Sequence, residues 1–401
     1  MTTYLIVGNG VAGNSAAENI RKVDAEGNIF IFSKERYFFY YTPALPEYLA
    51  GEKEIKNFTI HGEDWYAKNR IALHRETEIT SIDPAKNIAR NSRGETVGYD
   101  WLLLACGGKS FVPPIPGSAS EGVYTLRTID DADTIRNRAK GARKAVLIGG
   151  GLLGLEAGNG LRKLGLEVSV IEVFPRLLPR QMDIPGAAIL QRQMEEMGFR
   201  FYLGKKTREI VPGKDRLEVT LESSEKCEAD LVLVSAGVRP ELTLAKALGL
   251  EIDKGVKVDN TMKTSRDKIF AAGDLIEHQG RFYGIWAASQ EQGRIAGMNM
   301  AGQKAEYQGT VPSNALKVVG IDLVATGEID GEGRKESITR QSGKTYQKLV
   351  VEDNRIIGAI LLGDTKGSEE IQRAIQTGKN ISSLKKDLAD EHFDFDRLRE
   401  T

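Results

Sequence analysis

The sequence predicts an α/β fold: two Rossmann-like domains of the three-layer β-β-α type, followed by a small α+β domain. The first observation behind this fold class is a short apolar strand, residues 4–7, that runs directly into the pattern GNGVAG and an alanine-rich helix. The second is the return of the same pattern at residues 145–154. The third is a change near residue 310 to alternating strand patterns with one helix among them.

The first glycine pattern has the G-x-G-x-x-G spacing that suits a bound dinucleotide. Gly8 allows the tight turn from strand to helix, Gly10 lets a pyrophosphate approach the backbone, and Gly13 lets the helix pack on the sheet. The phosphates would lie at the helix N-terminus, where N–H groups and the helix dipole favour negative charge. Val11 and Ala12 complete this turn. The strand–turn–helix context is what the motif requires.

The second strand, residues 28–33, ends where an acidic residue would bind the adenosine ribose. Ser33 holds that place, Lys34 follows, and Glu35 comes two positions after the serine. We assign Glu35 to the ribose, and a solvated loop carboxylate is the alternative. Residues 37–51 are aromatic and broken by prolines, so they could wall a flat ring system or fill a gap between domains.

The second glycine pattern places Gly149, Gly151 and Gly154 after another apolar strand. Its second strand, residues 167–172, ends in a carboxylate, Glu172, at the position expected for ribose binding. Two domains built alike are far more specific than one glycine loop. They predict two bound nucleotides.

The repeat also bears on the two cysteines. Cys106 follows a buried strand and aligns with Ala236 of the second copy, so we interpret it as a small packed residue. Cys227 falls in a polar turn and is expected to be exposed and without function. The four histidines, at positions 61, 74, 278 and 392, are scattered and predict no metal site.

Composition excludes several classes of protein. The net charge of -1 argues against nucleic acid as a partner. No stretch approaches the roughly 18 apolar residues of a membrane span, and no leader pattern precedes the first strand. We therefore expect a cytoplasmic protein, either a monomer or a homodimer.

Residues 264–274 form a short strand that delivers Gly273 and Asp274 into a turn, where a carboxylate could bind a sugar-like polyol. A helix over residues 284–300 opens with small residues, among them Ala287, which would let its N-terminus approach a cofactor.

In these motifs the chain resembles the FAD-dependent pyridine nucleotide–disulfide oxidoreductase superfamily, and the likeness covers essentially the whole chain. Within that superfamily it is similar to the rubredoxin and ferredoxin reductase branch. The residues that carry the resemblance are 8–13, 102–107, 149–154 with Glu172, 264–274, 40–45 and 125–132.

The resemblance implies FAD on the first glycine pattern, with Asp274 on its ribityl chain and Arg127 nearby. It implies NAD(H) on the second pattern, with NADP(H) less favoured. It also implies a discontinuous FAD domain, residues 1–115 and 240–310, an NAD(H) domain, residues 116–239, and a C-terminal domain, residues 311–401. No cysteine precedes position 106, so the dithiol chemistry of the disulfide reductases is not expected.

The full set of predicted cofactor-binding residues comprises Gly8, Gly10, Val11, Ala12, Gly13, Ser33, Lys34, Glu35, Thr42, Pro43, Glu78, Ile79, Ala105, Cys106, Gly107, Arg127, Gly149, Gly151, Leu152, Leu153, Gly154, Glu172, Gly237, Gly273, Asp274 and Ala287. The predicted catalytic residue is Glu156, which would orient the nicotinamide carboxamide; a plain helix carboxylate is the alternative.

Two functions of different class follow from this pattern. The first is an NADH-dependent flavoprotein reductase, which moves a hydride to flavin N5 and then electrons to rubredoxin, ferredoxin or a small oxidant. The second is a redox-sensing protein that holds FAD and NADH and acts through a partner. Glu172 favours NADH because a carboxylate repels a 2′-phosphate, although Arg176 and Arg180 follow nearby.

Overall fold

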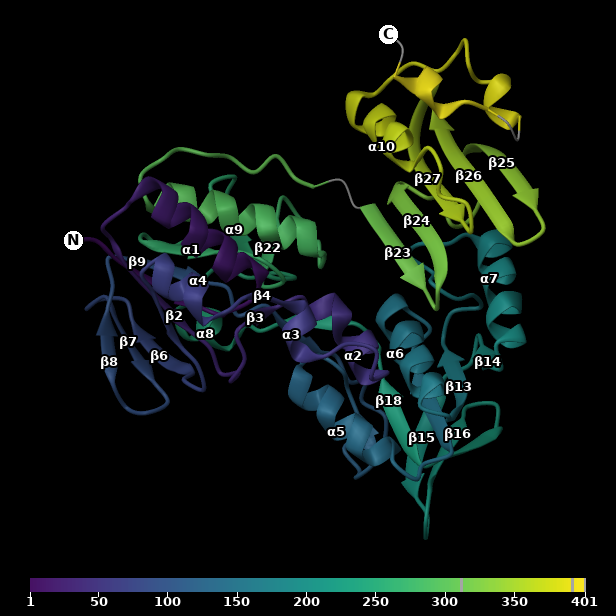
Figure 1. Ribbon diagram of the computed structural model, residues 1–401, viewed down its shortest axis with the longest axis horizontal. Coiled ribbons are helices and arrows are strands. Elements are labelled where there is room, and N and C mark those ends of the chain that lie inside the picture. The colour runs from purple at the N-terminus through teal and green to yellow at the C-terminus, as the bar shows by residue number, and fades with distance from the viewer. Residues whose placement is uncertain (311–312, 391–392, 400–401) are drawn as a thin grey trace. The chain divides into compact units, whose positions relative to one another are not determined.

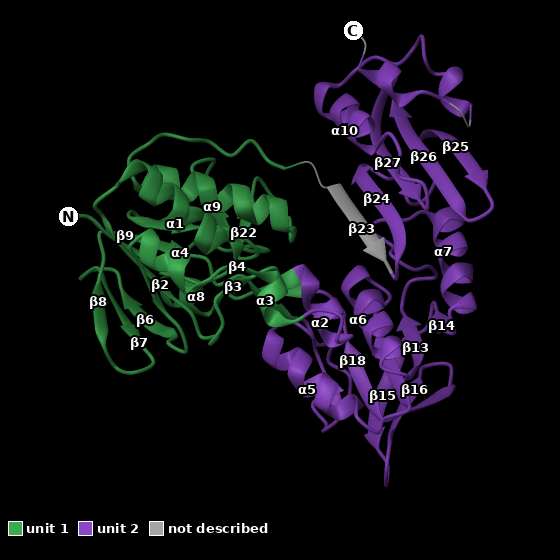
Figure 2. Cartoon of the chain, in the orientation of Figure 1, with its two compact units in different colours: residues 1–42, 54–110, 238–310 green, residues 43–53, 111–237, 311–401 purple. Residues whose placement is uncertain are grey.

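The computed structural model describes residues 1–310, 313–390 and 393–399, and for residues 313–318 the backbone alone (Figure 1). The chain divides into two compact units (Figure 2). The first comprises residues 1–42, 54–110 and 238–310, and the second comprises residues 43–53, 111–237 and 311–401. The first unit is thus discontinuous in sequence. The finer division into FAD, NAD(H) and C-terminal domains stays a prediction.

The first unit is organised around a five-stranded sheet, in which β1 lies between β2 and β9, parallel to both. These strands are rich in valine, isoleucine, leucine and phenylalanine, as expected for a parallel sheet that is covered on both faces. In spatial order the strands are β21 (Ile269–Ala271), β9 (Trp101–Leu104), β1 (Thr3–Val7), β2 (Asn28–Phe32) and β5 (Ile71–His74).

Helices α1 (Val11–Val23) and α9 (Trp286–Met300) lie side by side in this unit (Figure 1). Small residues allow the approach: a Cβ built on Gly293 would lie 2.2 Å from the carbonyl oxygen of Ala12. A Cβ on Gly297 would lie 2.4 Å from that of Ala16. The glycines therefore set the distance between the two helices.

An antiparallel sheet adds a further layer, and with the helices and the parallel sheet it confirms the β-β-α plan. Its strands are β6 (Ile79–Asp83), β7 (Ile88–Asn91) and β8 (Thr96–Gly98). The remaining short elements of the unit are β3 (Phe39–Tyr40), β4 (Thr59–His61), β10 (Gly108–Ser110), β19 (Val238–Pro240), β20 (Val256–Val258), β22 (Ile276–His278), α3 (Ile55–Phe58), α4 (Glu63–Lys68) and α8 (Thr243–Ala247). A 3-10 turn spans Thr42–Ala44, of which only Thr42 belongs to this unit.

The second unit contains the repeat of this plan. Its parallel sheet has the equivalent order β11 (Val123–Tyr124), β18 (Leu231–Val234), β12 (Lys144–Ile148), β13 (Glu167–Glu172) and β14 (Arg200–Leu203). The antiparallel partner sheet is β15 (Thr207–Pro212), β16 (Leu217–Leu221) and β17 (Lys226–Ala229). The helices are α2 (Leu45–Leu49), α5 (Ile129–Ala139), α6 (Leu152–Lys163) and α7 (Ile184–Glu196).

One expectation in this region was wrong. Cys227 lies on β17 rather than in a polar turn, and it is 7% exposed. Strand β17 alternates exposed and buried residues, so Cys227 and Ala229 point into the apolar cluster that contains Val219 and Leu221. Charged residues flank Cys227 in sequence, so the alternating exposed and buried residues of this short strand resemble the sequence of a polar turn.

The C-terminal part of the second unit is an antiparallel sheet with one helix, α10 (Ser368–Thr377). Its strand order is β23 (Ser313–Val318), β24 (Ile321–Gly327), β27 (Arg355–Leu362), β26 (Thr345–Glu352) and β25 (Glu336–Ser342), and two 3-10 turns follow at Asp387–Ala389 and Phe395–Leu398. Side chains of Leu323, Tyr346 and Leu362 share an apolar cluster with Met182 and Leu190, so this sheet packs on the repeat.

The close contact of α1 and α9 predicts that Gly293→Ala is destabilising. The added methyl group would overlap the Ala12 carbonyl, so we expect a loss of about 2 kcal/mol in the free energy of unfolding. Gly62→Ala is the matched control, because no described atom lies within 4 Å of a Cβ there and its φ is −94°. Denaturant titration measures both variants, and equal midpoints would contradict this account of the helix pair.

Candidate nucleotide-binding sites

The first glycine turn joins β1 to α1 in a conformation that excludes side chains. Gly8 has a φ of +122°, and a Cβ built on it would lie 2.1 Å from the carbonyl oxygen of Ala105. A Cβ on Gly13 would lie 2.1 Å from the carbonyl oxygen of Gly8. At Gly10, by contrast, no described atom lies within 4 Å of a Cβ. The turn therefore packs closely on neighbouring backbone at Gly8 and Gly13, and it leaves open space at Gly10.

Gly10 caps α1, and none of the described side chains accepts a hydrogen bond at this helix end. The first backbone N–H groups of the helix are consequently available to an anion. A pyrophosphate fits both the open space at Gly10 and the chemistry of these donors. The geometry therefore suits the nucleotide predicted for this turn.

A buried polar network that the sequence analysis missed holds this turn in place. Asn14, 1% exposed, donates from Nδ2 to the carbonyl oxygens of Asn9 (3.0 Å) and Gly10 (3.1 Å). The hydroxyl of Tyr66 donates to Oδ1 of Asn14 (2.8 Å) and of Asn9 (2.9 Å). An asparagine within the first turn of an apolar helix was the available signal, because it favours bonding to nearby backbone.

Around the end of β2, Ser33 is buried, Lys34 is exposed and Glu35 is half-buried. The hydroxyl of Tyr40 donates to Oε2 of Glu35 at 2.8 Å, and the backbone N–H of Glu35 donates to Oγ of Ser33 at 3.2 Å. Glu35 is thus an oriented carboxylate. Its contact with a ribose stays a prediction.

Asp274 follows β21 and lies beside the first turn of α9. The hydroxyl of Ser289 donates to its Oδ1 at 3.3 Å, while the buried side chain of Gln292 accepts the N–H of Gly273 at 2.9 Å. A Cβ on Gly273 would lie 3.1 Å from Cβ of Ala12, which brings this turn to the first glycine pattern. Ser289 and Gln292 were not predicted, since only the fold shows which face of α9 meets this turn.

Cys106 follows β9 next to Ala105, whose carbonyl faces Gly8. Burial raises the pKa of the Cys106 thiol to about 12, so the sulfur stays protonated at neutral pH. Burial also raises the pKa of the Cys227 thiol. A raised pKa disfavours the thiolate form of both cysteines, which fits the expectation that the chain is not a dithiol reductase.

The second glycine turn, between β12 and α6, repeats the first contact by contact. Gly149 has a φ of +117°, and its Cβ would lie 2.2 Å from the carbonyl oxygen of Ser235. A Cβ on Gly154 would lie 2.6 Å from the carbonyl oxygen of Gly149. At Gly151, the helix cap, no described atom lies within 4 Å, and none of the described side chains caps α6. This turn fits a second pyrophosphate.

Glu172 ends β13 beside this turn and is 6% exposed. Its Oε2 accepts the N–H of Gly150 at 2.6 Å, and its Oε1 accepts the N–H of Phe174 at 2.8 Å. Backbone donors therefore fix the carboxylate. Each oxygen keeps a further lone pair with which it could accept a ribose hydroxyl.

Glu156 lies on α6 and is half-buried. Its Oε1 accepts the N–H of Val319 at 2.8 Å, and burial raises the pKa of its carboxyl group. The structure thus shows an oriented carboxyl bound by the turn after β23. A role for Glu156 toward a nicotinamide stays a prediction.

The other predicted residues are scattered over both units. Glu78 is exposed and Ile79 is buried at the start of β6. Thr42 and Gly107 belong to the first unit, whereas Pro43, Arg127 and Gly237 belong to the second. Val11 and Ala12 begin α1, Leu152 and Leu153 begin α6, and Ala287 lies in the first turn of α9. Their contacts with a cofactor stay predictions.

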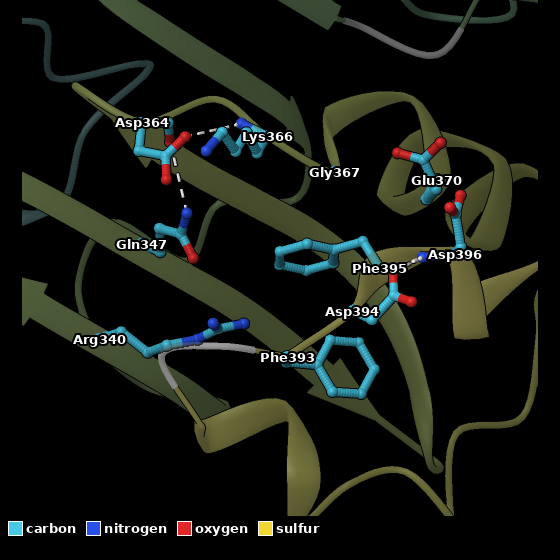
Figure 3. Close-up of a pocket in the computed structure, with 10 residues that line it drawn as sticks. All are labelled: Arg340, Gln347, Asp364, Lys366, Gly367, Glu370, Phe393, Asp394, Phe395 and Asp396. Atoms are coloured by element: carbon cyan, nitrogen blue, oxygen red, sulfur yellow. Dashed lines mark hydrogen bonds between the residues drawn. The ribbon is translucent and has the colours of Figure 1, made fainter.

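A polar pocket lies apart from these turns, on the C-terminal sheet (Figure 3). Arg340, Phe393 and Phe395 line it together with four carboxylates, and it contains no predicted site residue. Within the described part of the chain no group of histidine, cysteine and acidic residues could hold a metal ion; His392 lies outside the described residues. Nor is any helix of that part long and apolar enough to cross a membrane.

Comparisons with known proteins agree with this arrangement. The sequence model of the pyridine nucleotide-disulphide oxidoreductase family matches residues 2–305, and that of the rubredoxin NAD+ reductase C-terminal domain matches residues 312–379. A nitrite reductase [NAD(P)H] of Bacillus subtilis is 37% identical over 95% of this chain and 48% of its own length. The chain spans about half the length of several curated relatives it matches.

Other relatives match along their full length. An NADH-rubredoxin oxidoreductase of Clostridium acetobutylicum is 30% identical over 96% of this chain and 97% of its own. A solved NADH:rubredoxin oxidoreductase from that organism has a TM-score of 0.81 at 29% identity, covering 95% and 96% of the two chains. A ferredoxin reductase from Rhodopseudomonas palustris reaches 0.89 at 25% identity, covering 99% of each.

The open space at Gly10 predicts that a methyl group there would weaken nucleotide binding without disturbing the fold. In Gly10→Ala the methyl group meets no described atom, so the fold should be kept while the approach of a pyrophosphate is blocked. We expect the free energy of unfolding of the FAD-free protein to change by less than about 0.5 kcal/mol and FAD affinity to fall at least ~10-fold. Gly62→Ala is the control, and undiminished FAD binding by Gly10→Ala would refute the assignment.

Proposed function

Because the chain belongs to the pyridine nucleotide-disulphide oxidoreductase family, we propose that it is an NADH-dependent flavoprotein reductase that passes electrons to a separate acceptor. The family expected from the sequence is confirmed, as are the α/β fold class and FAD with NAD(P)H as the cofactors. The observation that carries the proposal is the pair of matching glycine turns, each with an open helix N-terminus.

Bound FAD supplies the electron chemistry, accepting a hydride from a nicotinamide and releasing electrons to an acceptor. The residues of the chain bind and orient the two nucleotides. Backbone N–H groups after β1 would hold the FAD pyrophosphate, and Asp274, positioned by Ser289, would bind the ribityl hydroxyls. The turn after β12 would hold the second pyrophosphate.

Glu156 acts on the nicotinamide end in this proposal. Its Oε1 is held by the N–H of Val319, which fixes the carboxyl group and leaves Oε2 to accept from the carboxamide. Such a contact would fix the carboxamide, and hydride transfer gains mainly from positioning of this kind.

The acceptor is proposed from the chemistry of the cysteines and from the relatives. The two cysteines form no C-x-x-C pair and burial raises the pKa of both thiols, so electrons leave the flavin without a sulfur relay. A C-terminal domain of the rubredoxin NAD+ reductase type supports a small redox protein as acceptor. The greater length of the nitrite reductase relatives supports a further domain or subunit as the alternative source of an acceptor site.

The acceptor test is anaerobic reduction with NADH, followed by stopped-flow mixing with rubredoxin, ferredoxin, O2 and a disulfide. Rapid flavin reduction and fast reoxidation by one of the redox proteins are expected. A reduced complex that none of these acceptors reoxidises would support a redox-sensing protein instead. Turnover with the disulfide would contradict electron transfer without a sulfur relay.

Glu172 predicts a preference for NADH. In this proposal the fixed carboxylate would meet a 2′-phosphate, so kcat/KM for NADH should exceed that for NADPH at least ~10-fold, or about 1.4 kcal/mol. Glu172→Ala should narrow this ratio, while Glu167→Ala, at the other end of β13, should leave it unchanged. Equal values for the two coenzymes in the unmodified protein would be incompatible with this role.

A further inference from the structure

We propose that Glu332, in the C-terminal part of the chain, sets the coenzyme preference by holding Arg176 away from the adenosine ribose. This inference rests on the proposed function and names a residue that determines its specificity. It explains how an arginine can follow Glu172 by four positions without creating a site for the 2′-phosphate of NADPH.

Arg176 lies on the segment between β13 and α7, four residues after Glu172, which we propose to bind the ribose. A guanidinium group in such a place is the usual partner of a 2′-phosphate, because its planar fork of donors matches phosphate oxygens. Position and chemistry alone would therefore predict use of NADPH.

The side chain of Arg176 is already engaged elsewhere. Its Nε donates to the carbonyl oxygen of Met182 at 3.1 Å, and its Nη2 donates to Oε1 of Glu332 at 2.8 Å. A longer contact, 3.4 Å, joins Nη2 to the carbonyl oxygen of Pro179. The side chain of Arg176 is 10% exposed and that of Glu332 is 54% exposed, so the Glu332 carboxylate covers the guanidinium group on its solvent side.

The loop that carries Glu332 is shaped for this contact. A Cβ built on Gly331 would lie 2.8 Å from Nη2 of Arg176, so a larger residue there would displace the guanidinium. Asp330 keeps the loop in place, because its carboxylate accepts the N–H groups of Arg334 and Lys335, each at 2.9 Å. The arginine therefore lies against a preformed surface.

A buried lysine contacts both the loop that carries Glu332 and the segment that carries Met182. Lys348, 2% exposed, donates from Nζ to the carbonyl oxygen of Asp330 at 2.7 Å, and its Nζ lies 3.3 Å from Oδ2 of Asp183. Asp183 directly follows Met182, whose carbonyl binds Arg176, and Asp330 precedes Glu332 by two residues. One buried lysine thus contacts a residue close in sequence to each of the two groups that bind the arginine.

The electrostatic consequence is selective. Glu332 pairs with Arg176, whereas the hydrogen bonds that the described residues donate to the Glu172 carboxylate come from the backbone N–H groups of Gly150 and Phe174. A 2′-phosphate would meet this carboxylate without a counter-charge from Arg176. Arg180 is exposed on the same segment, and its contribution has to be measured separately.

The test measures nucleotide affinity by calorimetry in the FAD-loaded protein, with 2′,5′-ADP as probe of the phosphate site and 5′-AMP as reference. In Glu332→Ala, affinity for 2′,5′-ADP should rise at least about 5-fold, with that for 5′-AMP unchanged. Arg176→Ala combined with Glu332→Ala should abolish the gain, whereas Arg180→Ala with Glu332→Ala should keep it. The matched control is Glu328→Gln, which alters the neighbouring carboxylate that pairs with Lys335 and not with Arg176.

A purely structural role for the ion pair would give a different pattern. Glu332→Ala and Arg176→Ala would then weaken binding of both probes alike, and the ratio of their affinities would stay constant, which would overturn the proposal. A gain that survives removal of Arg176 would also overturn it. Because the probes carry no nicotinamide, failure of NADH to reduce the flavin would refute the proposed function while leaving this readout intact.

Discussion

The structure depends on one steric constraint, the contact of a glycine with the end of a neighbouring strand. Gly8 lies against the carbonyl of Ala105 and Gly149 against that of Ser235, at distances where a Cβ could not fit. This contact brings the helix start to the edge of the parallel sheet. The next glycine of each pattern then leaves open space before an uncapped helix. A geometry that suits an anion therefore results from backbone packing alone, and it occurs twice.

The side chains that fix the surroundings of the two turns differ. In the first unit, Asn14 and Tyr66 tie the turn to its surroundings, and Gln292 positions the turn that presents Asp274. In the second unit, contacts from the C-terminal part fix side chains near the second glycine pattern in sequence, since the N–H of Val319 binds Glu156 and Glu332 binds Arg176. The C-terminal sheet thus does more than cover the repeat, because it orients side chains that we propose to act on the nucleotide.

Much of this architecture could be predicted because glycines that recur at a fixed spacing indicate a backbone geometry that excludes side chains. Gly8 to Gly13 and Gly149 to Gly154 identified both turns, and the carboxylate ending the second strand was visible as Glu172. The network of Asn9, Asn14 and Tyr66 joins residues up to 57 positions apart, so no local pattern could show it. The exposure of Cys227 was misjudged for the same reason, since its burial comes from the partner strands and not from its neighbours in sequence.

One chain should bind two different nucleotides at two separate turns. Native mass spectrometry of the protein, saturated with FAD and then titrated with NAD+, measures this directly. We expect one FAD and one NAD+ per chain, with neither displacing the other. A chain that could not be loaded with FAD, or one in which the two nucleotides competed for a single place, would contradict it.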